Sequence, residues 1–316
     1  MPVPWRCCVF YICRLSHADL LPGQRTMMRS HFLLVLLTIA TTANAVVVRS
    51  DVADSRYRVP ASAFPALADL PDEGHGVLIA PQWVVTAAHA APTNCMECDV
   101  SIGGVARKIK RVVTYPGYRK LPDAVVNEFL SSHDPSGVYA FLASSDDIAL
   151  VELAAPVTDV TPIPLFRGNN EMGMTAELAG KGATGNGSDG QDAHSSHRGV
   201  LRHAFNIIEG ANTRYVWYRF DPPPTALPLE GITGSGDSGG PLLIGQGRSR
   251  QLIGLASWGR YPANHPFWKS YATGGPFREG LYGEIVYAVR VSSYVQWMDS
   301  VMSAQGSTVA PSTMTP

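Results

Sequence analysis

A glycine-rich stretch surrounds a serine in the last third of the chain. It runs from Gly234 to Leu242, reads Gly-Ser-Gly-Asp-Ser-Gly-Gly-Pro-Leu, and has Ser238 at its centre. Four glycines and a proline are incompatible with a helix or an ordinary strand interior, so the backbone must turn sharply here. The glycines leave unshielded backbone N–H groups around the hydroxyl, as an oxyanion beside a nucleophilic serine requires. A Gly-Ser surface turn is the alternative, because such short motifs also occur by chance.

A serine hydroxyl is a poor nucleophile unless a base removes its proton and a third group orients that base. The histidine candidate is His89, which directly follows three small residues at 86–88. Residues 77–79 and 83–85 are short apolar runs of the β type, separated by residues 80–82 as in a hairpin. We expect His89 to lie just past the second strand, where the small residues let its imidazole face a cleft.

Between His89 and Ser238, Asp147 directly precedes the apolar residues 148–151. An aspartate before a short strand of this Asp-Ile-Ala-Leu type is what a resemblance to the trypsin-like serine proteases implies for the third residue. A residue that abuts such a strand is expected to be buried on the cleft side, so we assign the orienting role to Asp147. The neighbouring Asp146 is assigned to the solvated rim. Three residue types that together support nucleophilic catalysis therefore occur in the chain order His89, Asp147, Ser238.

The three motifs in this order resemble those of the trypsin-like serine proteases, over approximately residues 46–300. An α/β-hydrolase would place its acid and then its histidine after the serine, but no Asp or Glu lies between Ser238 and the only later histidine, His265. The resemblance implies an all-β fold of two six-stranded antiparallel β-barrels, with the active site between them and a C-terminal helix. It also implies that His89 acts as the base, Asp147 as its orienting group and Ser238 as the nucleophile of an acyl-enzyme mechanism.

The resemblance assigns two further groups of residues to the site. The backbone N–H groups of Gly236 and Ser238 would hold the oxyanion. The edge formed by Ser257, Trp258 and Gly259 would pair antiparallel with the substrate backbone. Such strand addition gives affinity that is independent of the substrate side chains, and it leaves selectivity to a pocket.

The pocket floor is expected six residues before the nucleophile, at Ile232, with Thr233 beside it. Trypsin-type enzymes carry an aspartate at the floor to pair with Lys or Arg, so an isoleucine favours an uncharged P1 residue. Glu230 and Glu284 lie near enough in sequence to reach the pocket if the loops follow another course.

Two disulfides of the family are missing. No cysteine lies near Gly234, where the pocket disulfide would begin, and Gly74 and Ala90 occupy the two positions of the bond that ties the histidine loop. The pair Cys95 and Cys98 is expected to close a local disulfide in an oxidising compartment. Half of a zinc site is the alternative, but no second pair exists to complete four ligands.

In the family, the residue that corresponds to Asp237 pairs inside the protein with a freed N-terminal ammonium. The usual Ile-Val-Gly-Gly start is absent here, but Val46 lies 43 residues (89 minus 46) before His89, close to the family spacing. We expect that cleavage before Val46 exposes the ammonium, because a buried carboxylate such as Asp237 needs a charged partner.

The N-terminal part of the chain has the features of a secretory signal. Met28 and a basic residue precede an apolar run at 32–40, and Ala43 and Ala45 form an Ala-x-Ala cleavage site. The run is shorter than the about 20 residues that span a bilayer, although an uncleaved anchor through Val48 is the alternative. We expect a secreted protein, extracellular or periplasmic, without stable membrane insertion after cleavage.

These features divide the chain into three parts. Residues 1–45 contain an upstream extension and the signal, which begins at about residue 28, and we expect translation to start at Met27 or Met28. The protease domain is expected over 46–302, with an N-terminal barrel at about 46–162 and a C-terminal barrel at about 163–302. Further expectations are helices at 122–132 and 291–302, a mobile loop at 185–198 and a disordered tail at 303–316.

The composition allows a sizeable core and gives no indication of nucleic-acid binding. Of the 316 residues, 45% are hydrophobic and 16% charged, with a formal net charge of -1. His194 and His197 have a spacing that could bind a metal, but no carboxylate signature accompanies them, so we interpret them as solvated loop residues. We expect no cofactor and no metal, a polypeptide as the substrate and a monomeric enzyme.

Two alternatives share the fold. One is a secreted binding protein without catalytic activity, since fold alone does not fix function. The other is an esterase, which assays on peptides and esters would distinguish. Because all three catalytic residue types are present in order, we expect a serine endopeptidase.

Overall fold

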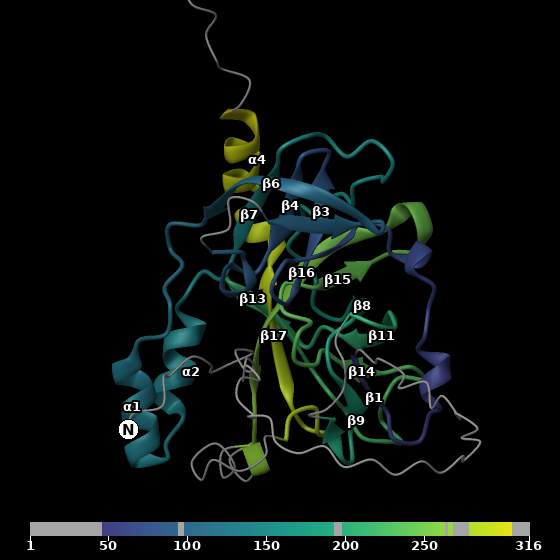
Figure 1. Cartoon of the computed structure of the whole chain (residues 1–316). Helices are drawn as coiled ribbons and strands as arrows, with labels where there is room; N and C mark the ends of the chain where they lie inside the picture. Colours follow the sequence, from purple (N-terminus) through teal and green to yellow (C-terminus); the bar gives the residue numbers. More distant parts are fainter. Residues whose placement is uncertain (1–45, 94–97, 193–197, 263–264, 268–277, 305–316) are drawn as a thin grey trace, which may run out of the picture.

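The computed structural model describes residues 46–93, 98–192, 198–262, 265–267 and 278–304. They form two β-structured halves, a first barrel (blue in Figure 1) and a second half (mostly green and yellow), and the mostly β fold with a C-terminal helix confirms the expected fold class. The strands are β1 (Val46–Val48), β2 (Leu67–Asp69), β3 (His75–Ala80), β4 (Trp83–Thr86), β5 (Asp99–Ile102), β6 (Val105–Thr114), β7 (Ala149–Leu153), β8 (Thr175–Gly180), β9 (Thr184–Asn186), β10 (Gly190–Gln191), β11 (Arg202–Ile207), β12 (Gly210–Ala211), β13 (Tyr215–Arg219), β14 (Gly231–Ile232), β15 (Pro241–Ile244), β16 (Gln251–Arg260) and β17 (Ile285–Arg290). The helices are α1 (Asp123–Ser132), α2 (Ser136–Ala143) and α4 (Val295–Ser303), and the short 3-10 helices include η3 (Ala88–Ala90) and η5 (Val291–Tyr294).

The first half is a closed barrel of six strands in the order β2-β3-β4-β7-β6-β5. Its interior is filled by an apolar cluster that includes Leu78, Val84 and Val151. Strand β4 pairs with both β3 and β7, and its register with β7 places Thr86 opposite Ala149. The end of β4 therefore lies beside the start of β7, so the residues that follow Thr86 are close to those that precede Ala149.

The second half differs from the expected closed six-stranded barrel. It consists of a seven-stranded sheet, β11-β8-β15-β16-β17-β13-β12, and a four-stranded sheet, β10-β9-β1-β14. The strands of the smaller sheet are only two or three residues long, and three of them contain glycine, which weakens strand pairing. Strand β1 inserts between β9 and β14, so residues 46–48 pair with the second half although they begin the range expected for the first barrel.

One apolar cluster connects the two halves. It contains Val85 and Leu150 of the first barrel, Leu255 of the second half and Met298 of α4. Helix α4 and the preceding η5 occupy the range predicted for a terminal helix. Because α4 includes Ser303, the tail predicted as disordered from residue 303 does not begin there, and residues 305–316 lie outside the described part.

A helical hairpin projects beside the two halves (Figure 1, left). Helix α1 lies where the sequence predicted a helix, and α2 packs against it. Helix α2 was not predicted, because Pro135 and Gly137 are typical of a loop. In the structure Pro135 is the residue before the first helical turn, and Oδ1 of Asp134 accepts the backbone N–H of Ser136.

Several predictions concern residues outside the described ranges, namely the signal within 1–45, Cys95, His194 and His197. Cys98 forms a disulfide, and its partner cysteine lies outside the described residues. In the part of the chain that the structure describes, no helix is long and apolar enough to cross a membrane.

Candidate active site

The adjacent ends of β4 and β7 bring His89 and Asp147 into direct contact. His89 lies in η3, and its Nδ1 is 2.6 Å from Oδ2 of Asp147. The backbone N–H of His89 also donates to Oδ1 of the same carboxylate at 2.8 Å. The carboxylate therefore fixes the orientation of the imidazole and favours the tautomer with its proton on Nδ1. Nε2 is then the nitrogen that can accept a proton from a nucleophile.

Asp147 is only 7% exposed and holds its charge in a buried position. Burial alone would raise its pKa, but the charge of the neighbouring His89 and the hydrogen bonds from His89 and Ser257 outweigh burial, so the pKa of Asp147 lies below its ordinary value. Ser257 is itself buried, and its Oγ donates to Oδ2 of Asp147 at 2.6 Å. The sequence predicted only a substrate-binding role for Ser257, because no local pattern connects Ser257 with Asp147, which is 110 positions away.

Replacing Ser257 by alanine is expected to lower kcat about tenfold and to change KM by less than about threefold. Asp147 would lose a hydrogen bond to its charged form, which is worth about 1.5 kcal/mol or more, and would hold the imidazole less firmly. Steady-state kinetics on a peptide substrate measure the effect. Ser300→Ala, at an exposed position of α4, is the control. Equal kcat values for the two variants would show that the Ser257 hydroxyl has no role.

The serine loop, residues 234–240, packs directly against the segment that carries His89. Gly239 has φ +73, and a Cβ at this position would lie 2.2 Å from Oγ1 of Thr86 and 2.3 Å from the carbonyl oxygen of His75, so only glycine fits. The carbonyl oxygen of Ser238 accepts the backbone N–H of His75 at 2.7 Å. These contacts place Ser238 beside the strand pair that leads to His89.

Ser238 is 5% exposed, and its hydroxyl has no hydrogen-bond partner among the described residues. In this conformation Oγ does not hydrogen bond to the imidazole of His89. Catalytic hydrogen bonds of ligand-free enzymes are often long and shorten only when substrate is bound. A buried hydroxyl without a partner costs free energy, so it is a feature that a structural role alone does not explain.

Gly236 and Asp237 shape the turn in front of Ser238. Gly236 has φ +88, which favours glycine. Asp237 is fully buried, and its two carboxylate oxygens accept the backbone N–H groups of Gly182 at 2.7 Å and Gly234 at 2.9 Å. These bonds anchor the turn that contains the two N–H groups predicted to hold the oxyanion.

Strand β1 begins close to the loop that binds Asp237. Val46 is fully buried and pairs with Thr184, two residues beyond the Gly182 amide that binds Asp237. Oγ1 of Thr184 donates to the carbonyl oxygen of Val46 at 2.9 Å. The φ of Val46 is 63, a left-handed conformation that a β-branched residue adopts only with strain.

The residues predicted for the pocket floor are part of the packed interior. Ile232 is 1% exposed, lies opposite Val47 in the β1–β14 pair and belongs to an apolar core cluster. Thr233 is also buried. Neither side chain carries a charge, so this part of the chain provides no partner for a basic P1 residue.

Two glutamates were considered within reach of the pocket. The carboxylate of Glu230 accepts the backbone N–H groups of Asp221 and Leu227 at 2.6 Å each, so it caps its own loop, and burial raises its pKa. Glu284 instead pairs with Nε2 of His265 at 2.9 Å. The structure therefore directs the Glu230 carboxylate into its own loop.

The three residues predicted to bind the substrate backbone lie near the end of β16. Ser257, Trp258 and Gly259 are all buried. Trp258 stacks on Tyr287 with ring centroids 4.0 Å apart, and Tyr139 of α2 lies 6.1 Å from Trp258 by the same measure. The helical hairpin therefore contacts the strand that is predicted to bind substrate.

Comparisons with known proteins agree with this fold. A family model described as Trypsin matches residues 55–273. The chain belongs to the trypsin family. A thrombin-like enzyme from Gloydius ussuriensis is 26% identical to this trypsin-family chain over 251 residues, which cover 75% of the chain and 80% of that enzyme. A trypsin from Phaedon cochleariae is 26% identical over 71% of the chain and 76% of its own length.

Two further relatives extend the comparison. Serine protease 56 of Mus musculus is 28% identical over 80% of this trypsin-family chain, which matches only 39% of that longer protein. A solved structure of neuropsin, described as a serine protease expressed in the limbic system of mouse brain, matches with a TM-score of 0.55 and 18% identity, over 78% of this chain and 98% of that one. The structural match shows the shared fold. With relatives named as serine proteases, this trypsin-family chain is a serine endopeptidase, a hydrolase.

Asp146 of this protease does not lie on the solvated rim, so that prediction is wrong. Its side chain is 15% exposed, and Oδ1 accepts hydrogen bonds from Nε of Arg214 at 2.9 Å and from the hydroxyl of Tyr294 at 2.7 Å. Arg214 and Tyr294 both follow the first barrel in sequence, so Asp146 joins the two halves directly before Asp147. The sequence around Asp146 contains no pattern that predicts these two partners, because both lie far away along the chain.

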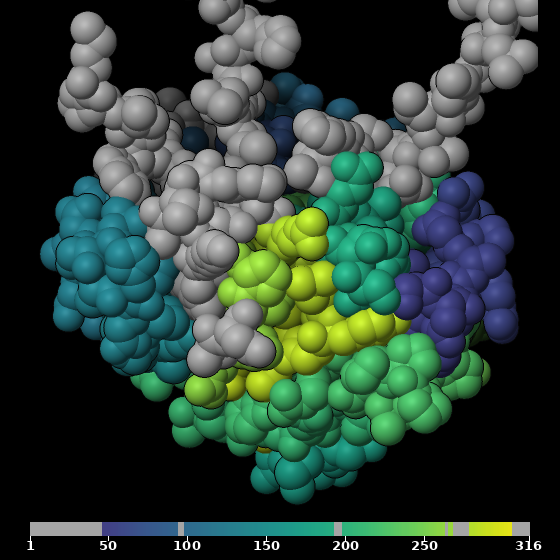
Figure 2. Space-filling model, turned by 90° about the horizontal axis from the view of Figure 1, so that it is seen from below, coloured from purple at the N-terminus to yellow at the C-terminus, as the bar shows by residue number. Residues whose placement is uncertain are grey.

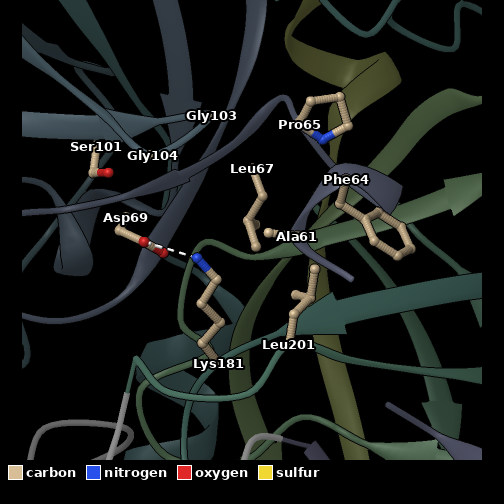
Figure 3. Close-up of a pocket in the computed structure, with 10 residues that line it drawn as sticks. All are labelled: Ala61, Phe64, Pro65, Leu67, Asp69, Ser101, Gly103, Gly104, Lys181 and Leu201. Carbon is tan, nitrogen blue, oxygen red and sulfur yellow. Dashed lines mark hydrogen bonds and ion pairs between the residues drawn. The ribbon is translucent and has the colours of Figure 1, made fainter. Parts of the chain in front are cut away.

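A cleft elsewhere on the protease is shown in Figure 3. Its lining includes Asp69 of the first barrel and Lys181 of the second half, whose Nζ lies 2.9 Å from Oδ2 of Asp69. None of His89, Asp147 and Ser238 lines this cleft. We interpret the ion pair as a structural contact between the two halves.

Alanine at Gly74 of the protease is expected to lower the free energy of unfolding by about 3 kcal/mol, against about 1 kcal/mol for Gly104→Ala. Both glycines have positive φ, +87 and +81. A Cβ at Gly74 would lie 2.9 Å from the Ser238 carbonyl oxygen and 3.0 Å from Cβ of Ala90, whereas nothing lies within 4 Å at Gly104. Gly104→Ala is thus the control that separates the free-energy cost of the positive φ from the cost of the steric clash. Equal losses in denaturant titrations would contradict this close packing.

Proposed function

We propose that this protease is a secreted enzyme in which His89, Asp147 and Ser238 form the catalytic triad. The observation that carries the proposal is the 2.6 Å hydrogen bond between Nδ1 of His89 and Oδ2 of Asp147. It supports an imidazole that is oriented to take a proton at Nε2. The close packing of Gly239 against Thr86 supports Ser238 as the residue that gives up this proton.

In the proposed reaction, Oγ of Ser238 attacks the scissile carbonyl carbon while its proton moves to Nε2 of His89. The backbone N–H groups of Gly236 and Ser238 hold the negative charge that develops on the carbonyl oxygen. The protonated His89 then gives its proton to the leaving amine, and an acyl-enzyme remains. Water attacks this ester with the same imidazole as base and restores the hydroxyl. Asp147 stays ionised throughout, in keeping with its lowered pKa.

The polypeptide substrate is proposed to pair with the backbone of residues 257–259 and to present an uncharged P1 residue. The uncharged side chains of Ile232 and Thr233 support this preference. The binding of Glu230 within its own loop removes one acidic candidate. A mixed peptide library would report the P1 preference, and cleavage restricted to Lys and Arg would contradict it.

Activity is proposed to require a free ammonium at Val46. The buried carboxylate of Asp237 accepts N–H groups from Gly182 and Gly234, and the register of β1 brings Val46 to this loop. The φ of Val46 is defined by the carbonyl carbon before it, so cleavage of that peptide bond removes the left-handed strain of about 1–2 kcal/mol. Both features favour the cleaved chain.

Secretion is proposed from the signal features of residues 28–45. The disulfide at Cys98 supports it, because disulfides persist in oxidising compartments. Cleavage after Ala45 would make Val46 the first residue of the mature enzyme. Sequencing the N-terminus of the secreted protein tests this directly.

A fluorophosphonate probe tests the triad. Such probes react with a serine hydroxyl whose proton is taken by a base, so peptide mapping is expected to find the label on Ser238 alone. Labelling is expected to disappear in Ser238→Ala and His89→Ala. Parallel assays on a peptide and on its ester separate a peptidase from an esterase. A label on another serine, or none in a folded enzyme, would contradict the proposed triad.

A further inference from the structure

A half-buried glutamate lies at the centre of a hydrogen-bond network beside the serine loop. Oε2 of Glu279 accepts the hydroxyl of Ser235 at 2.8 Å and Nε2 of Gln191 at 2.9 Å, and Oε1 accepts the hydroxyl of Tyr261 at 2.9 Å. All three partners donate, so the network fits an ionised carboxylate, which accepts at both oxygens. Such charge-assisted bonds are stronger than neutral ones.

Gln191 reinforces the contact between Glu279 and Ser235. Its Oε1 accepts the backbone N–H of Ser235 at 3.0 Å, and its Nε2 donates to Oγ of Ser235 at 2.9 Å as well as to Glu279. The backbone N–H of Gln191 donates to the carbonyl oxygen of Glu279 at 2.6 Å. In Figure 2 the teal-green segment around β10 and the yellow segment from residue 278 lie on the same face of the molecule. Ser235 is thus held by side chain and backbone at once.

The network ends next to the predicted oxyanion hole. Ser235 directly precedes Gly236, and the backbone N–H of Gly234 is bound by Asp237 at 2.9 Å. The carbonyl oxygen of Ser235 accepts the N–H of Ala183 at 2.6 Å. With these groups fixed, the peptide between Ser235 and Gly236 has little freedom to rotate. The orientation of the Gly236 N–H therefore depends on how firmly Ser235 is held.

The same segment has no room for the disulfide that the family resemblance implies. A Cβ at Gly234 would lie 2.3 Å from the carbonyl oxygen of Ala183. No cysteine occurs near this position in the sequence. The segment therefore needs another link to β16, the strand that is predicted to bind substrate. Tyr261, which is bound to Glu279, lies two residues after Gly259 of that strand.

We infer that Glu279 is a positioning residue, whose ionised carboxylate holds Ser235 and thereby orients the Gly236 N–H toward the oxyanion. The inference rests on the proposed function of Ser238 and Gly236. Glu279 does not touch the reacting atoms in this scheme. Its removal is therefore expected to weaken transition-state stabilisation more than substrate binding.

The charges around Glu279 give the network a pH dependence. Burial and the negative charge of Glu284 raise the pKa of Glu279. From the other packed segments it is faced by the hydroxyl of Tyr261, whose pKa is well above its ordinary value. Glu284 is itself paired with His265, and Arg278 is exposed. A raised pKa means that Glu279 takes up a proton at a higher pH than an ordinary glutamate. As the pH falls through that pKa, an acceptor is lost and kcat decreases.

Glu279→Gln imitates the protonated form, because an amide nitrogen replaces one accepting oxygen. At pH 8 its kcat is expected to be about tenfold lower than that of the native enzyme, with KM changed by less than about threefold. A peptide boronate, which forms a tetrahedral adduct in the oxyanion hole, is expected to bind about tenfold more weakly. Glu284→Gln is the matched control. It removes a neighbouring charge without touching Ser235, so it should keep the native kcat and the native boronate affinity at pH 8.

A double-mutant cycle separates positioning from a general loss of stability. In a Ser235→Ala background the link is already cut, so Glu279→Gln is expected to lower kcat only about threefold further. Native kcat and boronate affinity in Glu279→Gln, or full additivity in the cycle, would overturn the inference. If Ser238→Ala also remained active, the proposed triad itself would be wrong. An inactive Ser238→Ala beside a fully active Glu279→Gln would refute only the role of Glu279.

Discussion

Ser238→Ala is expected to lower kcat about a millionfold, the largest effect of any single substitution in this chain. Comparable serine hydrolases lose about this factor when the nucleophile is removed, and the remaining rate comes from binding and from the oxyanion hole. The hydroxyl of Ser257 is bound to the His89–Asp147 pair, but it donates its proton to Asp147 and not to the imidazole. Single-turnover and steady-state assays on a peptide substrate measure the loss.

Two further measurements make this result interpretable. The melting temperature of Ser238→Ala should equal or exceed that of the native enzyme, because the substitution removes a buried hydroxyl that has no partner among the described residues. KM should stay within about threefold, since the predicted binding edge at 257–259 is untouched. A kcat within about tenfold of the native value would remove Ser238 from the mechanism, whatever the stability of the variant.

Local sequence patterns predicted the elements that depend on neighbouring residues. The apolar runs at 77–79 and 83–85 form β3 and β4, and the helical patterns at 122–132 and 291–302 form α1 and the terminal helix. Alternation and helical periodicity specify such elements because they express the burial of one face. Helix α2 was missed because its first turn follows a proline and contains a glycine, which local rules assign to a loop.

The contact between His89 and Asp147 required more than local patterns. The two residues are 58 positions apart. They meet because β4 and β7 are neighbours in the barrel, although β5 and β6 lie between them in the sequence. Only the order of the motifs, through the family resemblance, indicated that they would converge. The bonds of Ser257 to Asp147 and of Glu279 to Ser235 could not be predicted in this way. A serine or a glutamate has many partners available, and tertiary packing decides which one it meets.

An enzyme that keeps two extra residues before Val46 is expected to lose kcat/KM by about a thousandfold. Val46 is fully buried and pairs with β9, and Val47 and Val48 pair with both β9 and β14, so the N-terminus that cleavage would create lies inside the packed second half. An added segment would replace the proposed ammonium by a neutral amide and leave Asp237 without its charged partner. The turn that Asp237 anchors contains both predicted oxyanion donors, and the loss of one such donor costs about a hundredfold to a thousandfold in comparable enzymes.

The extension is best tested beside a variant that changes the side chain but keeps the ammonium. Val46→Ile with a free N-terminus is expected to retain activity within about threefold, since isoleucine has similar volume and the same branching at Cβ. Asp237→Asn with a native N-terminus should resemble the extended enzyme, because it removes the other partner of the same ion pair. If the extended enzyme kept its native kcat/KM while Asp237→Asn lost activity, Asp237 would act through bonds such as those to Gly182 and Gly234 and not through an ammonium. The buried start of β1 would then serve packing, and cleavage before Val46 would not be the step that activates the enzyme.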